Sequence, residues 1–516
     1  MQKEITISLS PKGATEKQNI KYNAAKHLNI DTNLISDIII VKRSIDARSR
    51  KVNVHLKLSI FTEGEKSIPK KYQREYLDVS NGTPIVIVGS GPAGLFAALR
   101  LIELGIKPII LERGNDVIER RKDLGAIHKH KVNSDSNYCF GEGGAGTYSD
   151  GKLYTRSKKR GSIKRILEIL VSHGAVEDIM IDAYPHIGTN KLPKIIKKMR
   201  QNILDAGGEV HFNCRIVDLE FKGNKISGVI DQSGNKISGH SVILATGHSA
   251  RDIFHLLDRY KLEIEAKSFA LGVRIEHPQP IIDKAQYRCE TRSKYLPAAA
   301  YKFVQQINGK GVFSFCMCPG GQIVPSATKP GEVVVNGMSA STRSSRYANS
   351  GMVVAIEPNE LKEYNKYGNL SGLKFQEDME KMAWLAGGKS QAAPAQRMVD
   401  FVNGKDSTSL NDCSYIPGVK SAPLHNLLPE MIGSRLQKGF KIFGRKMHGY
   451  FTNQANILGV ESRTSSPLRI PRDETLLYHP QVSNLYPCGE GAGYAGGIVS
   501  AAIDGERCAE AIKNVL

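Results

Sequence analysis

The sequence has no run of apolar residues long enough, at about 18, to cross a bilayer, so it predicts no transmembrane helix. Its first ten residues, MQKEITISLS, are polar and alternate like a strand, without an apolar signal region. None of the eight cysteines stands in a Cys-x-x-Cys pair. This thin cysteine usage is typical of reduced thiols. We therefore expect a cytoplasmic protein without a disulfide framework or a metal site.

Acidic residues are scarce relative to basic ones, and the net charge is +20. Basic residues cluster in 152–165, 191–200 and 435–446. Such surfaces attract RNA, anionic lipid or a phosphorylated cofactor. No RNA-binding signature and no interleaved aromatic residues accompany these clusters. Solvated faces of a lysine-rich chain are the preferred explanation of these clusters, so RNA is a partner suggested by charge alone.

The segment 84–114, PIVIVGSGPAGLFAALRLIELGIKPIILERG, predicts a strand, a glycine turn, a helix and a second strand. Gly89 lets the chain turn, Gly91 lets the backbone approach a pyrophosphate, and Gly94 lets the helix pack against the strand. The start of the helix offers free N–H groups to phosphates. Glu112 stands about twenty residues further on, where a carboxylate accepts hydrogen bonds from a ribose hydroxyl. The segment therefore predicts a dinucleotide-binding unit.

The chain is long enough for two or three domains. We predict an α/β fold with a small N-terminal α/β module at residues 1–80. A Rossmann-like dinucleotide-binding domain would occupy residues 84–260 and return at residues 461–516. Residues 265–460 would form an inserted mixed α+β domain that covers the substrate.

Three segments indicate that the dinucleotide is FAD. In flavoproteins, a strand like the one ending at Thr246-Gly247 carries the chain back past FAD, and the hairpin before it places the Ile216 amide at the adenine. Cys488–Gly491 resembles the flavoprotein Gly-Asp motif, with Glu490 where aspartate is usual. The helix that starts at Gly497 would direct its positive end at the flavin.

The third segment, residues 138–156, contains five closely spaced glycines, which indicates backbone lying close to a flat or charged group. A flexible surface loop is the alternative. The predicted FAD-contacting residues are Gly89, Ser90, Gly91, Pro92, Ala93, Gly94, Glu112, Arg113, Gly143, Gly144, Ala145, Gly146, Ile216, Thr246, Gly247, Gly489, Glu490, Gly497 and Ile498.

Several long motifs together resemble one family of bacterial FAD-dependent dehydrogenases, often labelled "NAD(FAD)-utilizing dehydrogenase". These motifs are KRSIDAR, YCFGEGGAGTYSDGKL, PHIGTNKL, LATGHSARD, KSFALGVRIEHPQ, FCMCPGGQIVPS and NGMSASTRSSRYANSG. The resemblance covers nearly the whole chain and implies the flavoprotein fold. No second GxGxxG follows a strand, so NAD(P)H would need another site or would act as a transient electron donor or acceptor.

Five side chains are candidates for catalysis. His248 and Arg251 follow the ATG turn; the histidine could move a proton and the arginine could bind a substrate carboxylate. Hydrogen bonding between domains is the alternative for both. Lys152 belongs to the glycine-rich loop and could approach the flavin or a phosphate. We expect Cys316 and Cys318 to face opposite sides of a strand, so that one thiol could face the flavin and the two would not form a disulfide; two buried packing residues are the alternative.

Arg274 and Glu276 are expected to share one face of a strand, either as a substrate clamp or, more simply, as an ion pair. We predict an FAD-dependent oxidoreductase that transfers a hydride between a small organic substrate and flavin, which an unidentified redox partner then recycles. The alternatives are an FAD-dependent RNA-modifying protein and a flavin-binding protein whose N-terminal module recruits partners with little catalysis.

Overall fold

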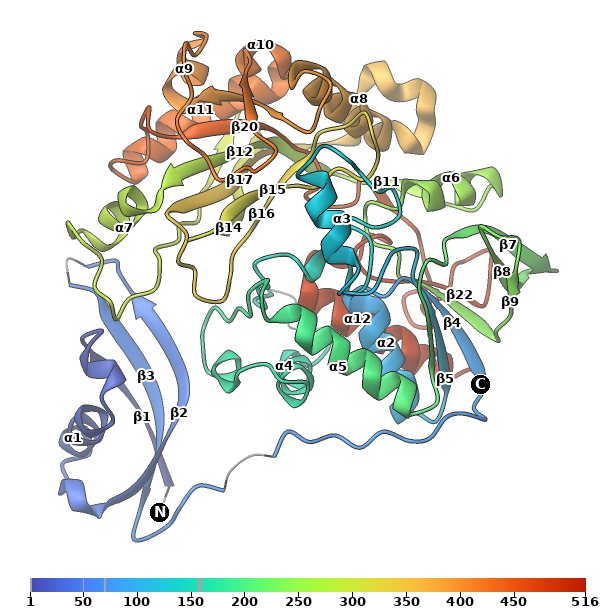
Figure 1. The fold of residues 1–516 in the computed structure, drawn as a ribbon. Helices are drawn as coiled ribbons and strands as arrows, with labels where there is room; N and C mark the ends of the chain where they lie inside the picture. Colours follow the sequence, from blue (N-terminus) through green and yellow to red (C-terminus); the bar gives the residue numbers. More distant parts are fainter. Residues whose placement is uncertain (1, 50, 69–70, 156–159) are drawn as a thin grey trace.

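A computed structural model of the protein describes residues 2–49, 51–68, 71–155 and 160–516 and has three parts (Figure 1). Residues 156–159, which belong to the first basic cluster and to the end of the glycine-rich segment, lie outside the described residues. Among the described residues, no helix combines the length and the apolar character needed to cross a membrane.

The N-terminal module is a three-stranded antiparallel sheet covered by one helix. Its strands lie in the order β1 (Gln2–Leu9), β3 (Asn53–Thr62) and β2 (Ile35–Asp46), and the helix α1 is Lys17–Leu28. Alternate side chains of β3 are buried against α1, as expected for a strand with one face on a core.

Arg43 in β2 joins this module to the next domain. Its backbone N–H donates to the carbonyl of Ile181 at 2.8 Å, and its carbonyl accepts from the N–H of Ala183 at 2.9 Å. Its guanidinium donates to the carboxylates of Asp182 and Asp178 at 2.7 and 2.8 Å. The module is therefore attached by backbone and side-chain contacts as well as by the chain connection.

The second part is a dinucleotide domain built on a five-stranded parallel sheet. The strand order is β22 (Leu485–Pro487), β10 (Ser241–Leu244), β4 (Pro84–Val88), β5 (Lys107–Leu111) and β6 (Glu209–His211). Its helices are α2 (Pro92–Glu103), α3 (Arg120–Ile127), α4 (Ile163–Ser172), α5 (Leu192–Asp205), α6 (Arg251–Arg259) and α12 (Ile498–Lys513). This arrangement confirms the predicted α/β class with a Rossmann-like domain.

Both faces of this sheet are covered, as Figure 1 shows for α2, α5 and α12 on one side and for the small sheet of β7 (Ile216–Lys222), β8 (Lys225–Asp231) and β9 (Lys236–Ile237) on the other. Within β4, Ile85 and Ile87 pack towards the helices, whereas Val86 and Val88 pack towards β7, β8 and α6. The continuous apolar run of β4 is the pattern of a parallel strand buried on both faces.

The third part covers the dinucleotide domain with a seven-stranded sheet. Its order is β13 (Val304–Ile307), β14 (Lys310–Cys318), β17 (Tyr347–Ile356), β12 (Phe269–Pro278), β20 (Asn456–Glu461), β18 (Ala393–Arg397) and β19 (Val419–Ser421). A hairpin of β15 (Gln322–Pro325) and β16 (Val335–Met338) adjoins it. The helices are α7 (Gln279–Tyr287), α8 (Ser371–Ala386), α9 (Met398–Asn403), α10 (Leu424–Leu427) and α11 (Glu430–Lys446).

Two short strands mark where the chain enters and leaves this covering domain. β11 (Glu265–Ala266) and β21 (Leu468–Arg469) pair with each other in an antiparallel ladder. Residue 265, the predicted start of the inserted domain, is the first residue of β11, whereas residue 460, its predicted end, falls within β20, before β21.

Candidate functional site

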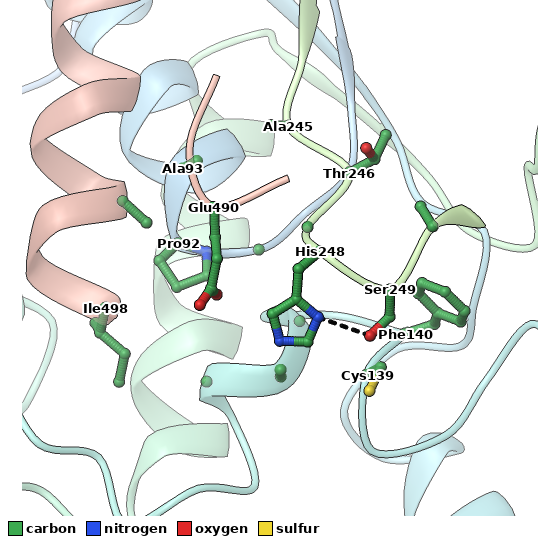
Figure 2. Close-up of a pocket in the computed structure, with 18 of the residues that line it drawn as sticks. Pro92, Ala93, Cys139, Phe140, Ala245, Thr246, His248, Ser249, Glu490 and Ile498 are labelled. Carbon is green, nitrogen blue, oxygen red and sulfur yellow. Dashed lines mark hydrogen bonds between the residues drawn. The ribbon is translucent and has the colours of Figure 1, made fainter. Parts of the chain in front are cut away.

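A cavity of about 370 Å³ extends from the glycine turn after β4 to the boundary between the dinucleotide and covering domains (Figure 2). The predicted residues that line it are Gly89, Gly91, Pro92, Ala93, Glu112, Arg113, Gly144, Ala145, Gly146, Lys152, Ile216, Thr246, Gly247, His248, Cys316, Glu490, Gly497 and Ile498. Ser90, Gly94, Gly143, Gly489, Arg251 and Cys318 lie outside this lining.

Close contacts between backbone atoms require glycine at two positions of the turn after β4. Gly89 has a φ of 105°, which favours glycine. A Cβ atom on Gly94 would lie 2.0 Å from the carbonyl oxygen of Gly89, so any larger residue would push α2 away from the strand. α2 begins after Gly91 with no side-chain cap, which leaves amide N–H groups of its first turn for a ligand.

Glu112 stabilises the same turn. One carboxylate oxygen accepts from the N–H and hydroxyl of Ser90 at 3.0 and 2.6 Å, and the other accepts from the N–H groups of Gly114 and Gly141 at 2.9 and 3.0 Å. The ribose hydroxyl predicted as its partner would have to share these oxygens. The neighbouring Arg113 donates to Asp135 and Asp252 rather than pointing freely into the cavity.

Arg120 supports the glycine-rich loop, and sequence reasoning missed it. Its fully buried guanidinium donates to the carbonyls of Asn137, Gly141, Glu142 and Gly144 at 2.8–3.1 Å. The loop also packs on the glycine turn at residues 89–94, because the N–H of Gly143 donates to the carbonyl of Ser90 at 3.0 Å. The sequence gives no signal for this role of Arg120, which stands next to a second arginine in α3, because its partners are backbone atoms.

The turn at residues 488–491, after β22, forms another part of the cavity wall through Glu490. Asp504 in α12 accepts from the N–H of Gly489 at 2.8 Å and pairs with Arg472, which positions the turn that presents Glu490. Burial raises the pKa of Glu490 to about 7, although the charge of Lys267 opposes this rise. Figure 2 shows Glu490, Pro92 and Ile498 around the same side of the cavity.

The end of the cavity between the domains is polar. Lys152 and Cys316 meet there with Asn336 and Thr464 of the covering domain, two residues for which the sequence predicted no role. His248 faces the cavity beside Ser249, with 2.8 Å between its Nδ1 and the serine hydroxyl (Figure 2). Burial, followed by the charges of Arg463 and Arg251, lowers the pKa of His248 to about 4. The imidazole is therefore neutral at pH 7.

Arg251 does not bind substrate in this arrangement, because its guanidinium is already paired. It donates two hydrogen bonds of 2.9 Å to Glu380 in α8. Arg463 donates to the same carboxylate at 3.1 and 2.9 Å. The prediction of a carboxylate-binding arginine is wrong, and the alternative of a hydrogen bond between domains is the one observed.

The expected pairing of Arg274 with Glu276 is also wrong. Arg274 is fully buried and donates to Glu461 of the neighbouring strand β20 at 2.7 Å. Glu276 instead accepts from the backbone N–H of Ser414 at 2.8 Å and from the hydroxyl of the same residue. Cross-strand neighbours within the sheet therefore decide the partner of Arg274, not spacing along β12.

The expectation that Cys316 and Cys318 face opposite sides is wrong as well. Residues two apart on a strand share a face, and their sulfurs lie 4.0 Å from each other. The pairing of β14 with β17 is irregular between Phe315 and Cys318, and Cys316 has a φ of 43°. Cys316 lines the cavity, whereas Cys318 is buried directly behind it.

Three families match parts of the chain. Residues 268–464 match "FAD-dependent protein, C-terminal domain-like", residues 82–126 match "FAD binding domain", and residues 1–61 match a domain of unknown function. These matches place an FAD-binding family on the glycine turn and an FAD-dependent family on the covering domain.

Full-length similarity is found with a protein of Clostridium beijerinckii named "Uncharacterized protein", which is 39% identical over 94% of each chain. A "Thiamine thiazole synthase" of Methanococcus vannielii is 29% identical over 38% of this chain and 67% of its own. Among solved structures, that of CtdE in complex with FAD is 12% identical and covers 84% of each chain with a TM-score of 0.33. That TM-score is too low to indicate a shared reaction.

Proposed function

We propose that this chain, which belongs to the same family as the Clostridium beijerinckii relative and matches an FAD-binding and an FAD-dependent domain family, uses FAD in the described cavity to oxidise or reduce a small organic molecule. One observation carries the proposal. The same cavity is lined at one end by the glycine turn after β4 and at the other end by polar side chains of both domains.

The residues present fit FAD. The uncapped first turn of α2 would bind the pyrophosphate, and the backbone at Ile216 would border the adenosine. A Cβ atom on Gly91 would have 3.9 Å to its nearest neighbour, the Cα of Gly144, so the chain leaves space over that glycine. The start of α12 at Gly497–Ile498 would present its positive end to the flavin.

Bound flavin would supply the chemistry of a hydride acceptor or donor. The chain's own residues would orient the substrate against it: Lys152 as a cation and Asn336 as an amide, both at the polar end of the cavity. Neutral His248 would accept or donate a hydrogen bond there without carrying charge. NADH or NADPH would serve as a transient electron donor or acceptor.

Cofactor content tests this proposal directly. Purified protein should be yellow and release FAD when denatured. The Gly91→Val variant should lose FAD but unfold at nearly the wild-type temperature once both are cofactor-free, because the nearest protein atom to its added Cβ is 3.9 Å away, at ordinary van der Waals distance. Gly125→Val is the matched control, since Gly125 is exposed in α3 and has nothing within 4 Å of an added Cβ.

Electron transfer is tested by mixing the oxidised protein anaerobically with a metabolite collection, NADH and NADPH, and following the visible flavin absorbance. Bleaching by an organic compound identifies the substrate. A colourless wild-type protein that cannot be reconstituted with FAD would overturn the proposal.

A further inference from the structure

Two thiols and an ammonium group form a compact cluster at the polar end of the cavity. The Nζ of Lys152 lies 3.8 Å from the sulfur of Cys316 and 3.7 Å from that of Cys318, and the two sulfurs are 4.0 Å apart. A disulfide needs the two sulfurs about 2 Å apart, so its formation would require the two side chains to rotate towards each other. The Lys152 side chain is 38% exposed, so the cluster is open to the cavity.

The charges around the cluster favour a thiolate on Cys316. A hydrogen bond from the thiol of Cys318 lowers the pKa of Cys316, burial opposes this, and the charges of Lys152 and Arg274 lower the pKa further. The same interaction raises the pKa of Cys318. Asp150 and Glu461 are the acidic groups beside Lys152 and Arg274, at 3.3 and 2.7 Å. One sulfur is thus prepared as a nucleophile while its neighbour keeps its proton.

A second pair of cysteines in the same protein is buried in packing and serves as a comparison for Cys316 and Cys318. Cys488 and Cys508 are fully buried outside the cavity lining, and their sulfurs and a carboxylate oxygen of Asp504 lie within 4.8 Å of one another. A hydrogen bond with Cys508 and then burial raise the pKa of Cys488. Neither thiol of this pair lines the cavity, and the raised pKa of Cys488 contrasts with the lowered pKa of Cys316.

We propose that Cys316 and Cys318 are a redox-active pair that takes two electrons from reduced flavin as a disulfide and passes them, as a dithiol, to a disulfide substrate. This inference rests on the proposed function, since flavin supplies the electrons. Reduction of the internal disulfide breaks its S–S bond with two electrons and one proton, which leaves a thiolate on Cys316 and a thiol on Cys318. Reduced flavin in its anionic form provides both electrons and the proton.

Transfer to the substrate then follows thiol–disulfide exchange. The Cys316 thiolate attacks one sulfur of the substrate, forms a mixed disulfide and releases the first substrate thiolate. Cys318 loses its proton and attacks the sulfur of Cys316, which re-forms the internal disulfide and releases the second substrate thiolate. Lys152 stabilises the negative charge on sulfur in both steps. Cys316 is the attacking residue because it alone of the pair lines the cavity.

Peptide mass spectrometry of the FAD-loaded protein tests the electron transfer. After mild oxidation, the peptide containing Cys316 and Cys318 should be lighter by two hydrogens and resist alkylation. Photoreduction of the bound flavin without oxygen should restore two alkylatable thiols. The Gly91→Val protein, which lacks FAD, should keep the disulfide under the same light. The Cys488 and Cys508 peptides should stay reduced throughout.

The disulfide reagent DTNB tests the exchange step. Reduced wild-type protein should release two equivalents of the coloured thiolate and end with the internal disulfide. Cys318→Ser should instead trap the mixed disulfide on Cys316, and Cys316→Ser should lose reaction at this peptide. Lys152→Met should slow the exchange at least several-fold while keeping bound FAD.

The outcomes separate the two proposals. If the protein binds FAD but Cys316 and Cys318 never form a disulfide, the redox pair is overturned and the proposed function stands. The same holds if photoreduction of the flavin leaves their disulfide intact. A colourless protein would overturn both.

Discussion

The guanidinium of Arg251 and the carboxylate of Glu380 form two parallel hydrogen bonds of 2.9 Å across the boundary between the dinucleotide and covering domains. Arg463 donates to the same carboxylate from the segment after β20. Glu380 is completely buried, so its charge is balanced by protein alone. This contact joins α6 of the dinucleotide domain to α8 of the covering domain.

We expect Glu380→Gln to destabilise the protein strongly, because it removes one of the two carboxylates, of Glu380 and Glu332, that pair with the buried guanidinium groups. Loss of one partner from a buried ion pair costs about 3–5 kcal/mol. Glu119→Gln, which removes an exposed pair with Lys122, should change stability by less than about 1 kcal/mol. Urea unfolding of both variants checks this, and equal losses would contradict a special role for Glu380.

The variant Gly94→Ala should destabilise even the cofactor-free protein. Its methyl group would lie 2.0 Å from the carbonyl oxygen of Gly89, so the turn and α2 must separate. Overpacking of this kind costs about 1–3 kcal/mol. Thermal unfolding of the FAD-free protein measures the loss, with Gly125→Ala as the control. Unchanged unfolding would show that the turn is looser than the structure indicates.

Glu490 should make the stability of the FAD-free protein depend on pH. Burial raises the pKa of Glu490 from 4.5 to about 7, so between these pH values the folded state keeps a proton that the unfolded state has lost. Stability therefore falls as pH rises through this window. We expect Glu490→Gln to remove part of the fall, on the order of 1–3 kcal/mol.

The measurement is the difference in unfolding free energy between wild type and Glu490→Gln at pH 5 and at about pH 7.5, bracketing the shifted pKa. Burial also raises the pKa of Glu276 and of Glu461 to about 7, and comparison of the two proteins cancels their contribution. A difference that does not change with pH would mean that Glu490 ionises normally.

The N-terminal module should loosen when Asp178 and Asp182 are both changed to asparagine. Each ion pair with Arg43 is partly exposed and contributes about 1 kcal/mol or less. The backbone contacts of Arg43 remain, so we expect faster protease cleavage between β3 and β4 without global unfolding. Glu4→Gln, which removes an exposed pair with Lys57 inside the module, is the control and should leave cleavage unchanged.

Much of the dinucleotide-binding part of the cavity could be predicted from the sequence, because it depends on contacts between residues close together in the chain. Gly89 and Gly94 act on atoms within a few residues, and the spacing to Glu112 follows from one strand–helix–strand unit. The donors that occupy the Glu112 carboxylate were not predictable, because Gly141 belongs to a loop that no local pattern places beside the turn.

Apolar runs and glycine spacing determined the strand–turn–helix unit at residues 84–103, the Rossmann-like class and the region predicted to contact the dinucleotide. These signals depend only on neighbouring residues. Only the tertiary structure decided that Arg251 pairs with Glu380, that Arg274 pairs with Glu461, and that Lys152 meets both Cys316 and Cys318. The physical reason is that ion pairs and thiol contacts form between side chains brought together by strand register and domain closure. Those are long-range properties that no local spacing encodes.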